Sequence, residues 1–212
     1  MGGSQPSALL RPGLLDGVRV VLAGGPQASP DSGFASSVGG LCERLGGSVA
    51  RCEAVLGGVA EEREAGTAEA VQRALARLGG AAVLIVDAAG LYELAPGQDG
   101  LDDALQATWD LVRALANGAF IPGPSGGRIF LLSPRSGTAD IHAAAAAAGL
   151  ENLARTLSVE WARYAITIVA IAPGGETSDE EVASVCAWLA SPAGDYFSGC
   201  LMDLRGPRAA GA

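Results

Sequence analysis

The residues that could carry proton transfer in this chain gather just before a run of six alanines, Ala143–Ala148. His142 is the only histidine, and an imidazole titrates near neutral pH. It could donate or accept a proton if Asp140 and Arg135 oriented its ring. No lysine occurs, because all 14 basic residues are arginine. Any mechanism that needs a lysine amine is therefore excluded.

Metal chemistry and disulfide chemistry are both disfavoured by the cysteine pattern. The four cysteines, which form no Cys-x-x-Cys pair, are Cys42, Cys52, Cys186 and Cys200. With a single histidine beside them, the chain lacks the ligand spacing of a zinc site, and we expect no metal. We expect the thiols to be reduced and buried.

Length and composition indicate one folded domain. The chain has 212 residues, of which 49% are hydrophobic and 17% charged, enough apolar material for a substantial core. The ends are rich in Gly, Pro, Ser and Ala, so we expect a flexible segment over 1–14, a domain over 15–206 and a flexible tail over 207–212. The net charge of -9 argues against nucleic acid. No apolar run is long enough to span a bilayer and no secretion signal is evident, which favours a cytoplasmic protein.

Apolar runs and helical patterns alternate along this domain. The runs that predict strands are 18–25, 48–52, 81–90, 127–133, 165–173 and 199–205. Helices are expected over 34–47, 67–80, 101–120, 143–164 and 179–191, with Thr67 and Ser178 as N-caps. Because the strand runs are continuously apolar, both faces of the sheet should be covered. The pattern predicts an α/β fold, a single Rossmann-type doubly wound parallel sheet with helices on both faces.

From about Leu15 to Gly206 the order of segments resembles the short-chain dehydrogenase/reductase family, nearest to its 3-oxoacyl reductase branch. Four stretches carry the resemblance: "LGGAAVLIVDAAG", "GRIFLLS", "AGLENLARTLSVEWARYAITIVAIAPGG" and "LASPAGDYFSGCLMDLRG". In that family a nicotinamide cofactor passes a hydride while a tyrosine transfers the proton. A lysine four residues further along the helix lowers the tyrosine pKa, which must fall by roughly 3 units, or about 4 kcal/mol, to reach neutrality. A serine orients the substrate carbonyl, and an asparagine positions a water.

Carried over position by position, the resemblance implies that each catalytic residue has been replaced. The lysine precedes the family's Ala-Gly-Leu, so its position is Ala147, and the tyrosine position is Ala143. The serine position is Pro134, flanked by Ser133 and Ser136, and the asparagine, six residues after Asp102, is Thr108. The alanine run thus occupies the active-site face of a helix without its chemistry.

The resemblance also implies a damaged cofactor loop. The family's Thr-Gly-x-x-x-Gly-x-Gly turn becomes "AGGPQASPDSGFAS", in which eight residues separate Gly24 from Gly33 and two prolines intervene. Proline cannot donate an N–H to a phosphate. The remaining loop positions are Phe34, Ala35 and, where the family has Asn-Asn-Ala-Gly, Asp87. The pair Glu61–Glu62 is poorly placed to replace the ribose contact. We expect no cofactor in this chain, and after Gly175 the family's substrate-covering segment is also missing.

Surfaces used for assembly in the family persist. The helices 101–117 and 143–164 and the C-terminal strand correspond to faces through which members form dimers and tetramers. The leading hypothesis is a catalytically inactive subunit, structural or regulatory, of a heteromeric dehydrogenase or reductase, in which an active paralogue binds NAD(P). Two plus two subunits are favoured by closed symmetry, and the tail could reach the partner's active site.

Two alternatives stay open. The first is an active oxidoreductase whose chemistry has been rebuilt around His142. The second is a non-catalytic nucleotide sensor, which requires a usable site at Gly24–Ala35.

Overall fold

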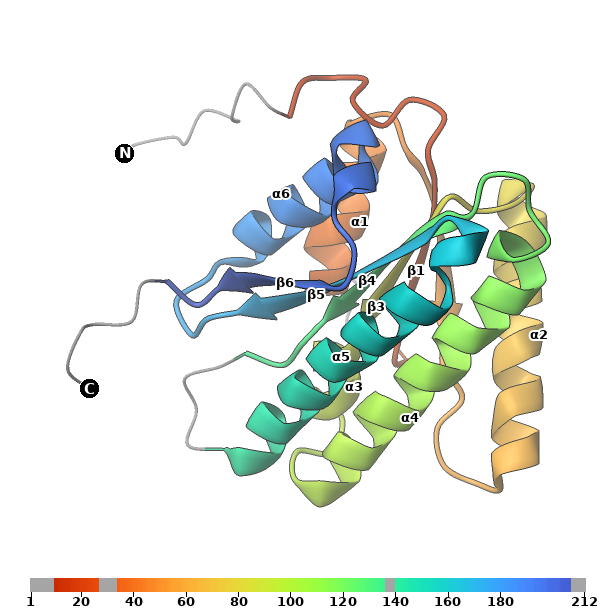
Figure 1. Cartoon of the computed structure of the whole chain (residues 1–212). Helices are drawn as coiled ribbons and strands as arrows, with labels where there is room; N and C mark the ends of the chain where they lie inside the picture. Colours follow the sequence, from red (N-terminus) through yellow and green to blue (C-terminus); the bar gives the residue numbers. More distant parts are fainter. Residues whose placement is uncertain (1–9, 27–33, 136–139, 207–212) are drawn as a thin grey trace.

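A parallel sheet of six strands organises the chain in the computed structural model, which describes residues 10–26, 34–135 and 140–206 (Figure 1). The strands are β1 (Arg19–Gly24), β2 (Ser48–Glu53), β3 (Val83–Asp87), β4 (Gly127–Leu132), β5 (Ile166–Pro173) and β6 (Cys200–Leu204). Their spatial order is β2-β1-β3-β4-β5-β6, and every neighbouring pair is parallel. The central strands are almost wholly buried, as their continuous apolar runs require.

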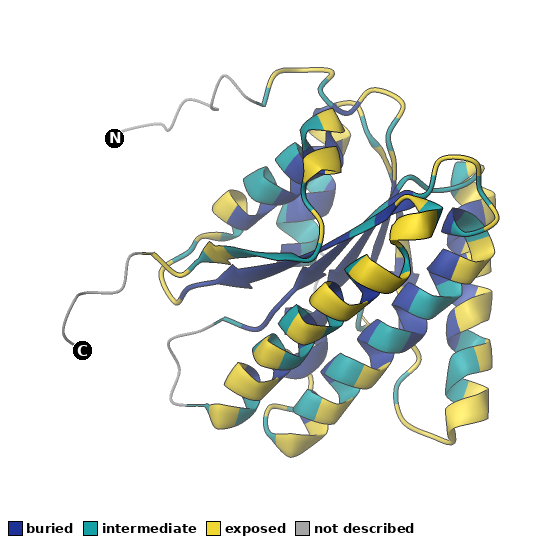
Figure 2. Ribbon diagram, viewed as in Figure 1, coloured by how far each residue is buried: buried dark blue, intermediate teal, exposed yellow. Residues whose placement is uncertain are grey.

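Helices cover both faces of this sheet. On one face lie α1 (Phe34–Arg44) and α6 (Asp179–Ala190); on the other lie α2 (Ala60–Leu78), α4 (Gln98–Leu115) and α5 (Ile141–Glu160) (Figure 1). The short α3 (Ala88–Glu93) follows β3 directly. A π-helical turn, Ala116–Phe120, ends α4, and 3-10 turns follow α5 and α6 at Ala162–Tyr164 and Pro192–Tyr196. The predicted Rossmann-type α/β fold is confirmed, with one buried cluster on each side of the sheet (Figure 2).

The order in which the chain adds strands to the sheet reverses at β1, and a crevice forms at this switch point. The chain leaves β1 through α1 to reach β2 at the edge, and it returns through α2 to β3 on the other side of β1. In doubly wound sheets ligands bind at such a switch point, beyond the carboxyl ends of the strands. The common order 3-2-1-4-5-6 has one more strand outside β2, whereas residues 54–59 here form a loop that leads straight into α2.

Several predicted element boundaries differ from the structure, as Thr67 and Asp87 show. Thr67 is not an N-cap, because α2 begins at Ala60; the buried Thr67 hydroxyl instead accepts a hydrogen bond of 3.3 Å from the Val55 backbone N–H. The strand expected over 81–90 ends at Asp87, whose side chain caps α3 by accepting from Gly90 N. Apolar composition alone could not distinguish the end of a buried strand from a buried helical turn.

Other caps follow the sequence signals. Ser178 is confirmed as the N-cap of α6 and forms a capping box with Glu181, in which each side chain accepts from the other residue's backbone N–H. The long helix begins two residues earlier than predicted, at Ile141, because Asp140 caps it by accepting from the backbone of His142 and Ala143.

The chain ends lie largely beyond the described residues. The predicted flexible segments include 1–9 and 207–212, which are outside them. Within the described part of the first segment, Leu10 and Leu14 contact the core beneath α1 and α6. Among the described helices, none combines the length and apolar character needed to cross a bilayer.

Candidate functional site

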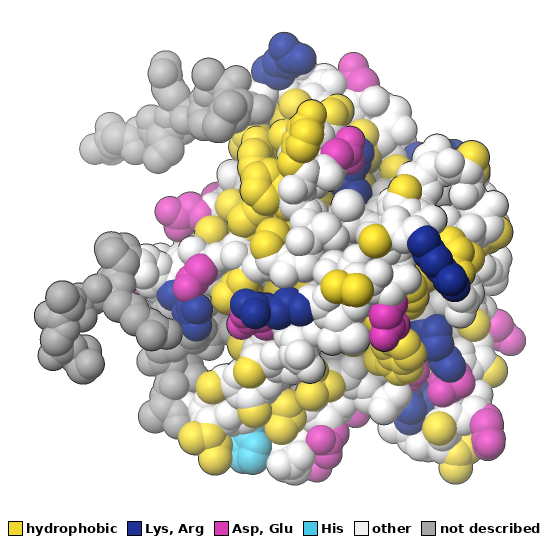
Figure 3. All heavy atoms as spheres, viewed as in Figure 1, with side chains coloured by type: hydrophobic (Ala, Val, Ile, Leu, Met, Phe, Trp, Pro, Cys, Tyr) yellow, Lys and Arg dark blue, Asp and Glu magenta, His cyan; other side chains and the backbone are white. Residues whose placement is uncertain are grey.

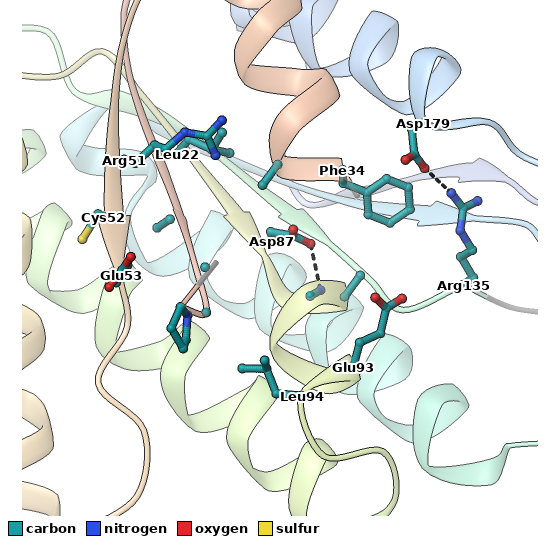
Figure 4. Close-up of a pocket in the computed structure, with 17 residues that line it drawn as sticks. Leu22, Phe34, Arg51, Cys52, Glu53, Asp87, Glu93, Leu94, Arg135 and Asp179 are labelled. Atoms are coloured by element: carbon teal, nitrogen blue, oxygen red, sulfur yellow. Dashed lines mark hydrogen bonds and ion pairs between the residues drawn. The ribbon is translucent and has the colours of Figure 1, made fainter. Parts of the chain in front are cut away.

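A cavity of about 390 Å³ opens at the switch point, where β1, β2 and β3 end (Figure 4). Its apolar walls include Leu22, Phe34 and Leu94. Six charged side chains complete it: Arg51, Glu53, Asp87, Glu93, Arg135 and Asp179. This is where a doubly wound fold holds a dinucleotide, so these side chains decide whether the cleft fits one.

Asp87 lies at the centre of this cavity and is only 7% exposed (Figure 4). Its carboxylate accepts a hydrogen bond of 2.9 Å from Gly90 N in the first turn of α3, and Ala35 in the first turn of α1 lines the same cavity. Burial, with smaller contributions from the negative charges of Glu93 and Asp179, raises the pKa of Asp87 to about 6, against the lowering effect of the Gly90 and Ala35 backbone amides. The carboxylate is therefore ionised at neutral pH at an energetic cost.

Arg135 closes the opposite wall. It forms an ion pair with Asp179 at the start of α6 and donates to the carbonyl oxygens of Gly174 and Thr177. Its guanidinium lies 4.5 Å from the centroid of the Phe34 ring. These contacts tie the loop after β4 to the loop after β5, and they leave the arginine charge matched by Asp179 rather than available to an anion.

The glycine turn after β1, Gly24 and Gly25, packs closely against Asp87 and Leu94. A Cβ added at Gly25 would lie 2.7 Å from Leu94 Cδ1, and one at Gly24 would lie 3.3 Å from the Asp87 Cβ. Leu94 thus packs directly against the turn over which a pyrophosphate passes in dinucleotide-binding folds. Of the predicted loop positions, Gly24, Phe34, Ala35 and Asp87 all line the cavity, whereas Gly33 lies outside the described residues.

The charges that line this cavity disfavour the phosphates of a dinucleotide. Four carboxylates and two guanidiniums line the cavity, so its formal charge is negative, and one arginine is already paired. The carboxylate of Asp87 faces the first turn of α1, whose amides and dipole are what normally attract phosphate. Glu61 and Glu62 lie exposed in the first turn of α2 and do not line this cavity.

The positions assigned to catalysis lie on α4, on α5 and just after β4. Ala143 is buried and Ala147 is half-buried on α5. Each is an alanine, so each position carries only a methyl group. Thr108 is buried on α4, and Pro134 is buried just after β4. Within the described part of the chain, the buried hydroxyls of Thr108 and Ser133 have no hydrogen-bond partner. Ser136 lies outside the described residues.

A tyrosine that sequence reasoning missed lies beside these positions. Tyr92 is buried at the end of α3, donates from its phenol to Asp140, and accepts a hydrogen bond of 3.2 Å from Gly97 N. Burial and the Asp140 carboxylate raise the pKa of Tyr92, the opposite of the change that proton transfer near neutral pH requires. The phenol is therefore a structural group, and no local sequence signal points to its partner.

His142 lies half-exposed in the first turn of α5, and Figure 3 shows the histidine at the surface. The alternative chemistry requires Asp140 and Arg135 to orient its ring. Asp140 instead accepts from Tyr92 and from the α5 backbone, and Arg135 pairs with Asp179. The described contacts therefore commit both orienting groups elsewhere. Nor do the described residues contain a group of three or more His, Cys, Asp or Glu side chains that could hold a metal ion.

Solved structures resemble this arrangement over nearly the whole chain. A short-chain dehydrogenase from Mycobacterium smegmatis matches with a TM-score of 0.71 and 22% identity, covering 95% of this chain and 100% of that one. The chain has the fold of the short-chain dehydrogenase/reductases. A citronellol catabolism dehydrogenase from Pseudomonas aeruginosa PAO1 matches at 0.66 and 23% identity over 92% and 95% of the two chains. A short-chain dehydrogenase/reductase from Serratia marcescens matches at 0.66 and 20% over 90% and 99%. No family model and no curated protein matches the sequence.

Proposed function

We propose that this chain is a non-catalytic subunit, structural or regulatory, of a heteromeric NAD(P)-dependent dehydrogenase or reductase. Its partner is a chain with the same short-chain dehydrogenase fold that carries an intact Tyr-x-x-x-Lys motif and binds the cofactor. Two chains of each kind in a closed tetramer is the arrangement we favour.

The observation that carries the proposal is the loss of both halves of the machinery in one chain. On α5, Ala143 and Ala147 supply neither a phenol nor an amine. In the cleft, Asp87 and Leu94 occupy the approach to the glycine turn. Such a chain can hold its fold, because the core on both faces of the sheet is complete, but it has no evident means to transfer a proton or to orient a dinucleotide.

The outer face of α5 supports the assembly part of the proposal. Its first half exposes Ala144, Ala145 and Ala148, and Ile141 and Val159 near its ends are 74% and 78% exposed. Figure 2 shows this exposed stripe along the helix, and Figure 3 shows largely uncharged surface over its first half. Small side chains let a second helix approach closely, and exposed apolar side chains favour burial against a partner.

α4 and α5 together form a surface that can pack against the corresponding two helices of a related chain. They pack closely because Gly149 admits Leu105, whose Cδ2 would lie 2.9 Å from a Cβ at that glycine. A relative with the same fold presents the same two helices, so a twofold or pseudo-twofold contact can join the two pairs. A second contact is available at β6, the edge strand of the sheet.

The proposal is tested by co-expressing this chain with a short-chain dehydrogenase that has an intact Tyr-x-x-x-Lys motif and is encoded beside it. We expect the two to co-purify through a tag on either chain and to elute as one species larger than either alone. The complex should reduce or oxidise a substrate with NAD(P), and mutation of the partner's tyrosine should abolish this activity.

A matched pair of variants locates the contact. Ala148→Glu puts a charge on the α5 face and should dissociate the complex, whereas Ala76→Glu makes the same change at an exposed position of α2 and should leave it intact. Equal behaviour of the two variants, or a stable species of this chain alone that ignores the partner, would count against the proposal.

A further inference from the structure

The Asp87 carboxylate lies where the amino ends of two helices converge. Gly90 N, in the first turn of α3, donates to it at 2.9 Å, and Phe34 and Ala35, in the first turn of α1, line the same cavity. The free amides and the dipole at the start of a helix attract anions, and in nucleotide-binding folds that anion is a phosphate of the ligand. Here the chain itself supplies the anion.

The surroundings of the Asp87 carboxylate disfavour its ionised form. Glu93 on α3 and Asp179 on α6 add negative charge, and burial opposes ionisation, so the pKa of Asp87 is raised to about 6. The remaining charged groups that line the cavity are Arg51 and Glu53 on β2, which offset each other, and Arg135, which is paired with Asp179. Among the described residues that line the cleft, none therefore compensates Asp87 with an unmatched positive side chain.

We propose that Asp87 is a built-in anion that takes the place of a ligand phosphate at α1, so that the cleft rejects phosphate-bearing molecules as long as this residue is ionised. One substitution that removes the charge and keeps the shape turns the cleft into an anion site. The inference deepens the proposed function, since it explains why this chain leaves the cofactor to its partner. It concerns this chain alone and does not depend on the partner.

The test measures binding of inorganic pyrophosphate to the purified full chain by isothermal titration calorimetry at pH 8 and fixed ionic strength. Asp87→Asn should bind about ten-fold more tightly than the unmodified chain, because one repulsive charge next to the anion has been removed. Glu62→Gln is the matched control, since it removes one carboxylate from the exposed first turn of α2, outside the cavity. It should bind no better than the unmodified chain.

A second measurement needs no substitution and covers the case in which Asp87→Asn does not fold. Sulfate keeps its charge between pH 5 and pH 8, so its binding to the unmodified chain reports the protein's own titration. The affinity should be higher at pH 5, where Asp87 is protonated, and in Asp87→Asn this pH dependence should be much weaker. An exposed cluster of acids titrating below pH 5 would not produce this difference.

Three results would overturn the inference. They are pyrophosphate binding to the unmodified chain as tight as to Asp87→Asn, an equal gain with Glu62→Gln, or sulfate binding that does not change with pH. None of these results bears on whether the chain forms a heteromer with a partner. Conversely, failure to find a partner leaves the anion measurements valid, so the two proposals fail separately.

Discussion

Tyr92 on α3 donates a hydrogen bond to Asp140, the residue that caps α5. The contact joins the turn after β3 to the start of the helix on which Ala143 and Ala147, the positions predicted for the family's tyrosine and lysine, lie. Asp140 also accepts from the backbone of His142 and Ala143. The Tyr92 hydroxyl thus binds the side chain that caps α5, and its raised pKa keeps the phenol protonated at neutral pH.

Tyr92→Phe is expected to destabilise the fold by removing this donor. The Tyr92 hydrogen bond is the main cause that lowers the pKa of Asp140, ahead of the backbone donors. A carboxyl whose pKa is lowered by folding stabilises the protein above its unfolded pKa near 4, and that stability is lost as the pH falls. The free energy of unfolding, measured with urea, should therefore differ between Tyr92→Phe and the unmodified chain at pH 7, and the difference should shrink below about pH 4. Tyr164→Phe is the control, because the Tyr164 hydroxyl accepts only from the exposed Arg163; an equal loss in both variants would contradict the role of Asp140.

The fold could be predicted from sequence because its signals are local. The continuous apolar run before Asp87, the glycine after α2 and the cap at Ser178 each act within a few residues. Ala143 and Ala147 are assigned to the family's tyrosine and lysine positions from their spacing to a neighbouring motif, and that assignment stays a prediction. That these positions hold neither a tyrosine nor a lysine can be read directly from the sequence.

The role of the cleft residues could not be predicted in the same way. Tyr92 meets Asp140 across 48 residues, and Asp87 and Ala35 line one cavity only because β1 and β3 are neighbours in the sheet. Leu94 reads as an ordinary helix residue until its contact with Gly25 is seen. These relationships depend on the sheet order at the switch point, which no local pattern specifies.

The ion pair between Arg63 and Asp110 ties α2 to α4 and should be the costliest to break. Asp110 is 1% exposed and receives the Arg63 Nε–H at 2.8 Å, with a further hydrogen bond from Gln106. Arg63→Met leaves a buried carboxylate without its cation, which costs about 3–5 kcal/mol of unfolding free energy. Replacing both partners with apolar residues should recover much of that loss, because the unpaired charge is then gone.

The pair between Arg113 and Glu64 is the natural control, because it joins the same two helices in partial contact with solvent. Arg113→Met should cost below about 1 kcal/mol. Chemical denaturation of the variants measures both values. Similar costs for Arg63→Met and Arg113→Met would show that burial does not govern these pairs.

The cysteines should react slowly in the folded chain. All four are free; three are buried, and Cys200 is half-buried. Burial raises the pKa of Cys42 to about 12 and that of Cys52 to about 11, so the thiolate that reacts is scarce at pH 8. A thiol-specific dye should label Cys200 first and the others only after unfolding, as mass spectrometry of the labelled peptides can follow. Rapid labelling of Cys52 in the folded protein would mean that the cleft opens more readily than its geometry indicates.

Asp87 should impose a pH dependence on stability that runs opposite to that of a paired carboxylate. Its pKa rises from 3.8 to about 6 on folding, so between these values the folded chain holds more protons than the unfolded chain. The free energy of unfolding must then fall as the pH rises from about 4 to about 6, by about 3 kcal/mol from this group. Asp87→Asn lacks this titration, while every other carboxyl is common to both proteins. The difference in unfolding free energy between the two, measured at intervals from pH 4.5 to pH 7.5, should therefore shift in favour of the variant as the pH rises. Parallel curves would show that the Asp87 carboxylate is not buried at the helix termini, and the exclusion of phosphate would then need another cause.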